Sequence, residues 1–127
     1  MTMASNPDGP VDPEVTVIRF IGERGNTKAL LVHYTCHATT TGDNFVSSEF
    51  PGVAMDYIEE YIGGSTVATY LQGFCGDGQP ALIKDGIFYR GNDQDVYHLG
   101  QIFGDEVLMV IKNPMEELQP TRIIAEL

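Results

Sequence analysis

The sequence is poor in basic residues. Seven Lys and Arg stand against eighteen Asp and Glu, which gives a formal net charge of −11 at pH 7. A chain of this charge repels the phosphate backbone of DNA and RNA, so we expect no nucleic-acid partner. The acidic residues are scattered along the chain instead of forming blocks, a pattern typical of a solvated acidic surface.

Cysteines and long apolar runs are also scarce. The two cysteines, Cys36 and Cys75, are too few for a disulfide scaffold, and we expect both to be buried free thiols. No apolar run reaches the length of a membrane span, so we expect no transmembrane segment. Residues 1–6 lack the basic and apolar regions of a signal peptide. The sequence as written therefore predicts a soluble, cytoplasmic protein, and a signal further upstream in a longer parent would change that prediction.

Several well-known catalytic signatures are missing. The chain has no Gly-x-Ser-x-Gly segment, phosphate-binding glycine loop, His-Glu-x-x-His motif or dinucleotide fingerprint. Its 127 residues, 43% of them apolar, suffice for one domain with a moderate core. We expect a flexible leader over residues 1–13, which are rich in Pro, and a single domain over residues 14–127.

The apolar pattern predicts an α/β fold, with a mixed, partly parallel sheet of three to four strands and two flanking helices. Pro51 is expected as the first residue of one helix, and Asn92 and Asp93 as the cap of the other. Gly100 and Gly104 lie one turn apart on the second helix, where we expect them to allow a close approach to the sheet. The predicted strands cover residues 14–21, 28–36, 65–72 and 122–127, the helices residues 51–62 and 93–112, a hairpin turn residues 23–27, and loops residues 37–50 and 78–91.

Two polar segments follow two of the predicted strands. The strand–helix–strand order makes these strands a parallel pair, so both polar segments leave the same edge of the sheet. Ligands of open α/β sheets bind at that edge. We therefore expect His37 and Asp77, which lie in these segments, to line one pocket.

The chemistry of these residues leaves alternatives open. His37 is placed to bind a metal through a ring nitrogen, or it is a satisfied structural histidine. Asp77 could orient a histidine or contact a metal in a second shell, or it simply forms a Gly-Asp-Gly turn. Cys36 should point to the opposite face from His37, and His33 should lie in the core. Nothing marks Cys75 as an activated nucleophile.

Four segments, taken in order, resemble the neutral/alkaline non-lysosomal ceramidase family. Residues 9–15 resemble the approach to a strand in that family, and residues 34–39 (Tyr-Thr-Cys-His-Ala-Thr) resemble its Cys-His-Pro-Thr type motif. Residues 48–52 (Ser-Glu-Phe-Pro-Gly) resemble its Ser-x-Asp-x-x-Gly type segment, and residues 71–80 its Gly-Asp-x-x-Pro segment. The helix from residue 95 follows as in the family. The resemblance covers residues 9–113 and implies the middle part of a longer catalytic domain.

The resemblance implies an N-acylsphingosine amidohydrolase, an enzyme that hydrolyses the amide bond of ceramide, a lipid-like amide, with a bound zinc. His37 matches a zinc-ligand histidine, and Gln79 falls at the position of the family's nucleophilic serine. Ala38 and Glu49 replace the usual proline and aspartate. The family's remaining zinc ligands have no matching motif here, so we expect weak or no zinc binding and no activity in isolation. The alternative is a non-catalytic binding or assembly domain that reuses the scaffold.

The expected sheet also predicts association. The strands over residues 28–36 and 65–72 are apolar on both faces and call for cover on both sides. Two helices cover only part of a four-stranded sheet, and the chain end leaves a strand edge unpaired. We therefore expect a homo-oligomer, or cover from segments of a longer parent chain.

Overall fold

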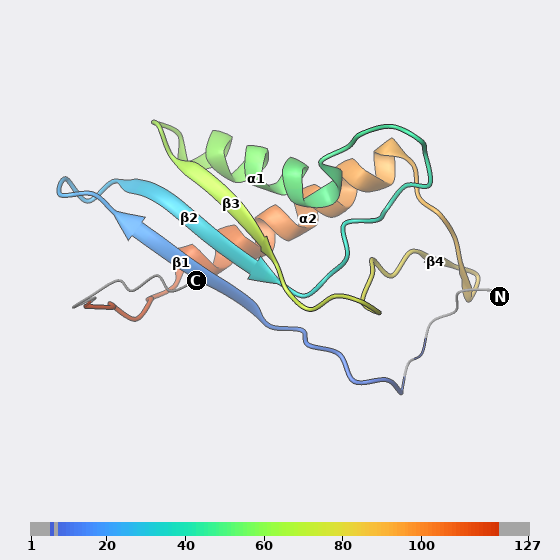
Figure 1. Cartoon of the computed structure of the whole chain (residues 1–127). Helices are drawn as coiled ribbons and strands as arrows, with labels where there is room; N and C mark the ends of the chain where they lie inside the picture. The colour runs from blue at the N-terminus through green and yellow to red at the C-terminus, as the bar shows by residue number, and fades with distance from the viewer. Residues whose placement is uncertain (1–5, 7, 120–127) are drawn as a thin grey trace, which may run out of the picture.

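A mixed three-stranded sheet forms the centre of the molecule. The computed structural model describes residues 6 and 8–119. Its strands are β1 (Val15–Ile21), β2 (Thr27–Tyr34) and β3 (Val67–Gln72), side by side in the order β1-β2-β3. β1 and β2 are antiparallel and joined by a tight turn, whereas β2 and β3 are parallel. The predicted α/β class with a mixed, partly parallel sheet is confirmed (Figure 1).

Two helices pack against one face of this sheet. α1 (Glu49–Ile62) connects β2 to β3, and α2 (Asp93–Lys112) lies beside α1 (Figure 1). A capping box fixes the start of α2. The Asn92 side chain accepts a hydrogen bond from the backbone N–H of Asp95, and the Asp95 side chain accepts one from the backbone N–H of Asn92. No helix of the described chain is long and apolar enough to cross a membrane. The buried core between the sheet and the helices consists of Leu30, Val32, Cys36, Phe50, Ala54, Met55, Ile58, Ala68, Phe103, Val107 and Leu108.

The two helix glycines serve a different contact from the one predicted. A Cβ atom on Gly100 would lie 2.5 Å from the Cβ of Val53, and one on Gly104 would lie 2.6 Å from the Cδ1 of Tyr57. Val53 and Tyr57 belong to α1. The prediction that these glycines approach the sheet was therefore wrong: they let α2 pack closely on α1.

The structure corrects several other boundaries. α1 begins at Glu49, two residues before Pro51, and β2 ends at Tyr34 instead of residue 36. The predicted loop over residues 78–91 contains a short hairpin, β4 (Ile83–Lys84) and β5 (Ile87–Phe88), that turns at Asp85 and Gly86, both with positive φ. The predicted strand over residues 122–127 lies outside the described residues.

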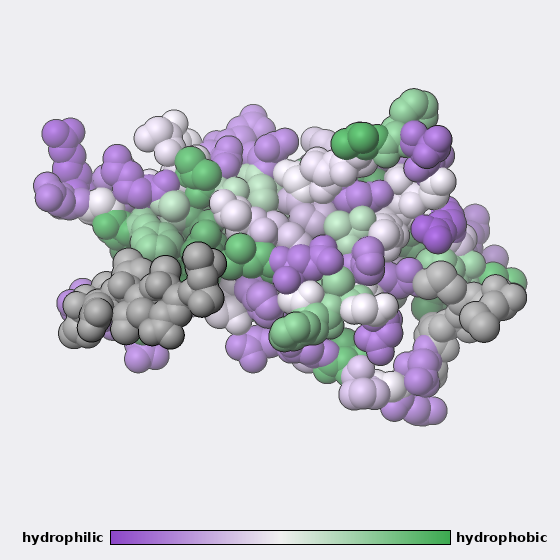
Figure 2. Space-filling model, in the orientation of Figure 1, coloured by the Kyte–Doolittle hydropathy of each residue, from purple (hydrophilic) through white to green (hydrophobic). Residues whose placement is uncertain are grey.

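Among residues 6 and 8–119, no helix packs on the opposite face of the three-stranded sheet. Neither helix covers it, and His33, predicted for the core, lies on this face and is half-buried. Ile18, Phe20, Val67 and Leu71 remain 40–56% exposed there. Apolar residues gather over the sheet on the side seen in Figure 2. We call this surface the open sheet face; its residues alternate with the core residues of each strand and are Thr16, Ile18, Phe20, Ala29, Leu31, His33, Val67, Thr69 and Leu71.

Candidate functional site

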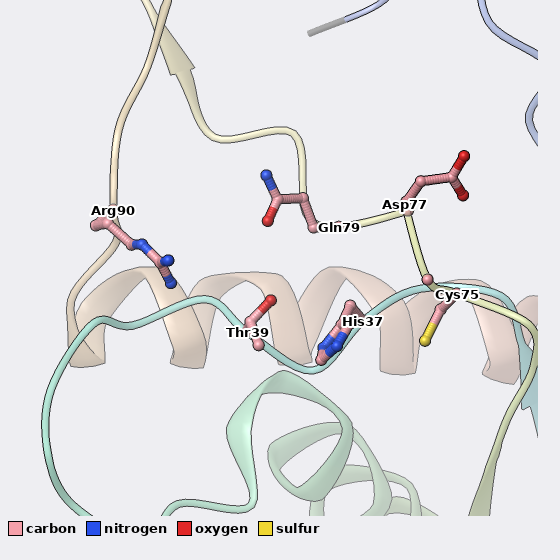
Figure 3. A pocket seen from close by; sticks show the side chains of 8 residues that line it. His37, Thr39, Cys75, Asp77, Gln79 and Arg90 are labelled. Carbon is pink, nitrogen blue, oxygen red and sulfur yellow. The ribbon is translucent and has the colours of Figure 1, made fainter. Parts of the chain in front are cut away.

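An open pocket of about 260 Å³ lies beyond the carboxyl ends of β2 and β3. His37 and Thr39 come from the segment after β2, and Asp77 and Gln79 from the segment after β3 (Figure 3). As expected from the strand–helix–strand order, His37 and Asp77 line the same pocket. The complete lining is His37, Thr39, Cys75, Gly76, Asp77, Gly78, Gln79 and Arg90.

Backbone hydrogen bonds hold the two segments together past the ends of the strands. Gly73 N–H donates to the carbonyl of Tyr34 at 3.0 Å, which extends the parallel ladder by one step. His37 N–H donates to the carbonyl of Gly78 at 2.7 Å. Tyr70 adds a side-chain link, because its single hydroxyl proton is shared between the carbonyls of Tyr34, at 3.1 Å, and Cys36, at 3.0 Å. The backbone that carries the His37 side chain is thereby tied to the Gly-Asp-Gly segment.

A buried carboxylate fixes the other end of the His37 segment. Glu49, only 8% exposed, accepts from the backbone N–H of Thr40 at 2.9 Å and from that of Thr41 at 3.3 Å. It also accepts from the hydroxyl of Thr41 at 2.9 Å. Glu49 has a φ of +53°, a left-handed conformation that side chains rarely adopt. The start of α1 therefore acts as a clamp on the pocket segment.

The predicted site residues share the pocket but do not all face one another. His37 and Asp77 are exposed, and Gln79 is half-buried. Figure 3 shows Gln79 across the pocket from His37, whereas the Asp77 carboxylate points outward, away from His37. The structure thus brings His37 and Gln79 to one hollow and does not show Asp77 orienting the imidazole.

The two cysteines are free and buried, as predicted. Cys36 packs in the core and Cys75 lies at the pocket wall, where the Gln72 side-chain amide donates to its sulfur. Burial, helped by the nearby Cys75, raises the pKa of the Cys36 thiol to about 11. A thiol held neutral in this way is a poor nucleophile and a poor metal ligand.

Sequence reasoning missed two lining residues, Thr39 and Arg90. Thr39 lies only two residues beyond His37, so the polar segment itself was the available signal. Arg90 had no such signal. It reaches the pocket because Gly91 forms a parallel bridge with Thr41, a contact between segments fifty residues apart.

The described residues do not complete a zinc site. No group of three or more His, Cys, Asp and Glu residues that could hold a metal ion occurs within residues 6 and 8–119. A catalytic zinc takes three protein ligands and a water. Of the residues in the pocket, His37 is the one whose side chain suits zinc, since Asp77 points away and Cys75 is buried.

The architecture has counterparts among solved structures. No protein-family model matches the sequence, and no curated protein matches it significantly. A structure of ceramidase in complex with C2 superposes with a TM-score of 0.67 over 82% of this chain, at 18% identity. The fold is that of a ceramidase segment. Neutral ceramidase from Pseudomonas aeruginosa gives a TM-score of 0.65 over 78% of this chain, at 20% identity.

The match spans most of this chain but only a small part of each ceramidase chain. The chain covers 18% and 17% of the lengths of the two ceramidase chains. The resemblance read from the sequence is therefore confirmed as a shared fold. The pocket residues stand on this fold at the carboxyl edge of its sheet, where open α/β folds bind ligands.

Proposed function

We propose that the chain forms part of a ceramidase-like amide hydrolase, in which His37 is a zinc ligand and Asp77 and Gln79 belong to the reaction site. The substrate class is a lipid-like amide of the N-acylsphingosine type. One observation carries the proposal: His37 and Gln79 come from separate segments and meet in one pocket, on a fold shared with a segment of neutral ceramidase.

The pocket supplies only part of the required machinery. Three protein ligands are the usual minimum for a catalytic zinc, and this chain offers His37 alone among its described residues. Gln79 cannot act as a nucleophile, because its side-chain amide has no basic or acidic form near neutral pH. It can hydrogen-bond a substrate carbonyl oxygen through its NH₂ group. We therefore propose that hydrolysis requires segments outside this chain and that the isolated chain is inactive.

A non-catalytic role is the second candidate. Gln79 at the position of the family's serine and the incomplete ligand set both favour a binding or assembly domain that reuses the scaffold. Such a domain would keep the pocket for recognition of a ligand and would carry out no chemistry there.

The open sheet face bears on both candidates. None of its nine residues is Asp, Glu, Lys or Arg, on a chain of net charge −11. Apolar sheet surface of this kind is normally covered. We propose that a second copy of the chain or the remainder of a larger protein covers it.

An activity assay on two proteins separates the candidates. The 127-residue chain and the complete gene product are each incubated with N-acetylsphingosine and zinc, as wild type and as His37→Ala. We expect hydrolysis by the complete gene product, its loss in His37→Ala, and none by the 127-residue chain. His98→Ala provides a matched control, since His98 is exposed on α2 and does not line the pocket. A complete gene product that is folded and inactive would instead support the non-catalytic role.

A further inference from the structure

Arg90 places a cation in the pocket of a strongly acidic protein. It is one of only seven Lys and Arg residues, and its side chain extends toward Thr39 (Figure 3). Its backbone is held firmly, because Gly91 N–H donates to the carbonyl of Thr40 at 2.9 Å and Gly91 bridges Thr41. The position of Arg90 is therefore coupled to the segment that carries His37.

The described residues leave most of the guanidinium unused. Its one hydrogen bond among them runs from Nη1 to the carbonyl of Thr41 and is long, at 3.4 Å. Asp77 is the carboxylate in the pocket lining, and it lies at the other end of the pocket and points away (Figure 3). A guanidinium has five N–H donors in a fixed fork. At least four of them thus remain for a ligand.

We infer that this pocket binds a carboxylate, held by the guanidinium of Arg90 with the Thr39 hydroxyl and the Gln79 side-chain amide beside it. Arg and carboxylate match in geometry, because two parallel N–H donors meet two oxygens. The acidic surface disfavours anions elsewhere on the molecule. Arg90, whose side chain is exposed, is the cation in the lining of this pocket.

This inference rests on the proposed function and specifies its ligands. Hydrolysis of an N-acyl amide breaks the C–N bond: the hydroxyl of water joins the acyl carbon, and protons pass to the amine and solvent. The acyl product is a carboxylate at neutral pH. A carboxylate could also be carried by the amine part of the substrate, as in an N-acyl amino acid. The pocket of about 260 Å³ is smaller than typical drug-sized ligand pockets, so it would take the carboxylate end and leave a long chain outside.

Binding can be measured without any catalysis. The ¹⁵N-labelled chain is titrated, at constant ionic strength, with acetate, N-acetylglycine and the neutral N-acetylglycinamide, and amide shifts are followed at Thr39, Gly78 and Gly91. We expect both carboxylates to shift these amides and the neutral amide to leave them in place. Loss of a charge-assisted contact is worth about tenfold in affinity. Arg90→Gln should therefore weaken carboxylate binding about tenfold, whereas Arg24→Gln, which removes the same charge at the exposed turn between β1 and β2, should not.

The comparison of acetate with N-acetylglycine also separates the two sources of the carboxylate. Equal affinity for acetate and N-acetylglycine points to the acyl product, and tighter binding of N-acetylglycine points to a substrate with its own carboxylate. Unchanged binding in Arg90→Gln, equal binding of the neutral amide, or stronger binding of inorganic phosphate would each overturn the inference. Failure of the hydrolysis assay alone would refute the proposed function and leave the carboxylate site standing.

Discussion

Replacement of Glu49 tests how the pocket segment is held in place. Its carboxylate is buried and accepts three hydrogen bonds, two from backbone amides and one from the hydroxyl of Thr41. Hydrogen bonds to charged groups contribute about 1.5–3 kcal/mol each, and such contributions do not simply add. We expect Glu49→Ala to lower the free energy of unfolding by about 3–4 kcal/mol, because two N–H donors lose their partner. Glu49→Gln keeps one acceptor oxygen and should cost about 1–2 kcal/mol.

The backbone conformation of Glu49 provides an internal check. At a φ of +53°, an alanine bears the steric cost of the left-handed region, which glycine does not. Glu49→Gly should therefore be more stable than Glu49→Ala by about 1 kcal/mol, although both lack the carboxylate.

Urea unfolding followed by far-ultraviolet circular dichroism measures these differences. The matched control is Glu60→Gln, an exposed change on the same helix that also removes one negative charge from a protein of net charge −11. If the unfolding free energies of Glu49→Gln and Glu60→Gln differ by less than about 0.5 kcal/mol, the carboxylate of Glu49 does not clamp the pocket segment.

Three further predictions concern the helix contact, the Cys36 thiol and the open sheet face. Gly100→Ala gains about 1 kcal/mol of helix propensity, but its methyl group would lie 2.5 Å from the Cβ of Val53. We therefore expect the unfolding free energy in urea to fall by about 1–2 kcal/mol, and a rise would show that α2 can shift away from α1. Because the folded pKa of Cys36 is raised from 9.0 to about 11, its neutral thiol contributes stability that is complete below pH 9 and is lost as the pH rises from 9 to 11. Unfolding curves at pH 8 and pH 10.5 should therefore show a smaller decline for Cys36→Ala than for wild type, and equal declines would contradict the shift. On the open sheet face, Leu71→Gln should weaken self-association, as measured by light scattering over a dilution series. Val46→Gln, in an exposed loop, should leave self-association unchanged. A wild-type protein that stays monomeric at high concentration would contradict the predicted association.

The sequence predicted correctly the ends of those elements that are fixed by neighbouring residues in the chain. α2 runs over the predicted residues because Asn92 and Asp95 form a capping box at its start and Pro114 follows its end. The beginning of α1 was misplaced by two residues because Glu49 is held there by Thr40, a contact from another segment. The β4–β5 hairpin was missed because strands of two residues carry no periodicity.

The same distinction between local and long-range contacts applies to the candidate site. His37 and Asp77 could be placed together from topology alone, since parallel strands deliver their carboxyl ends to one edge. The orientation of Asp77, pointing away from His37, depends on the turn it occupies, and the approach of Arg90 depends on the bridge between Thr41 and Gly91. Incomplete cover of the sheet could be foreseen, because apolar residues on both sides of β2 call for more cover than two helices supply. The sequence did not indicate what covers the second face.

Zinc titration of the 127-residue chain tests most directly the claim that it carries one part of a metal site. Calorimetry is combined with ¹H–¹⁵N spectra of the histidine side chains, for wild type and His37→Ala. We expect no stoichiometric binding at micromolar zinc. At millimolar zinc we expect weak shifts centred on the His37 imidazole that disappear in His37→Ala. Tight stoichiometric binding that is abolished by His37→Ala would show that this chain completes a zinc site by itself, and shifts elsewhere with none at His37 would remove the basis for its proposed role.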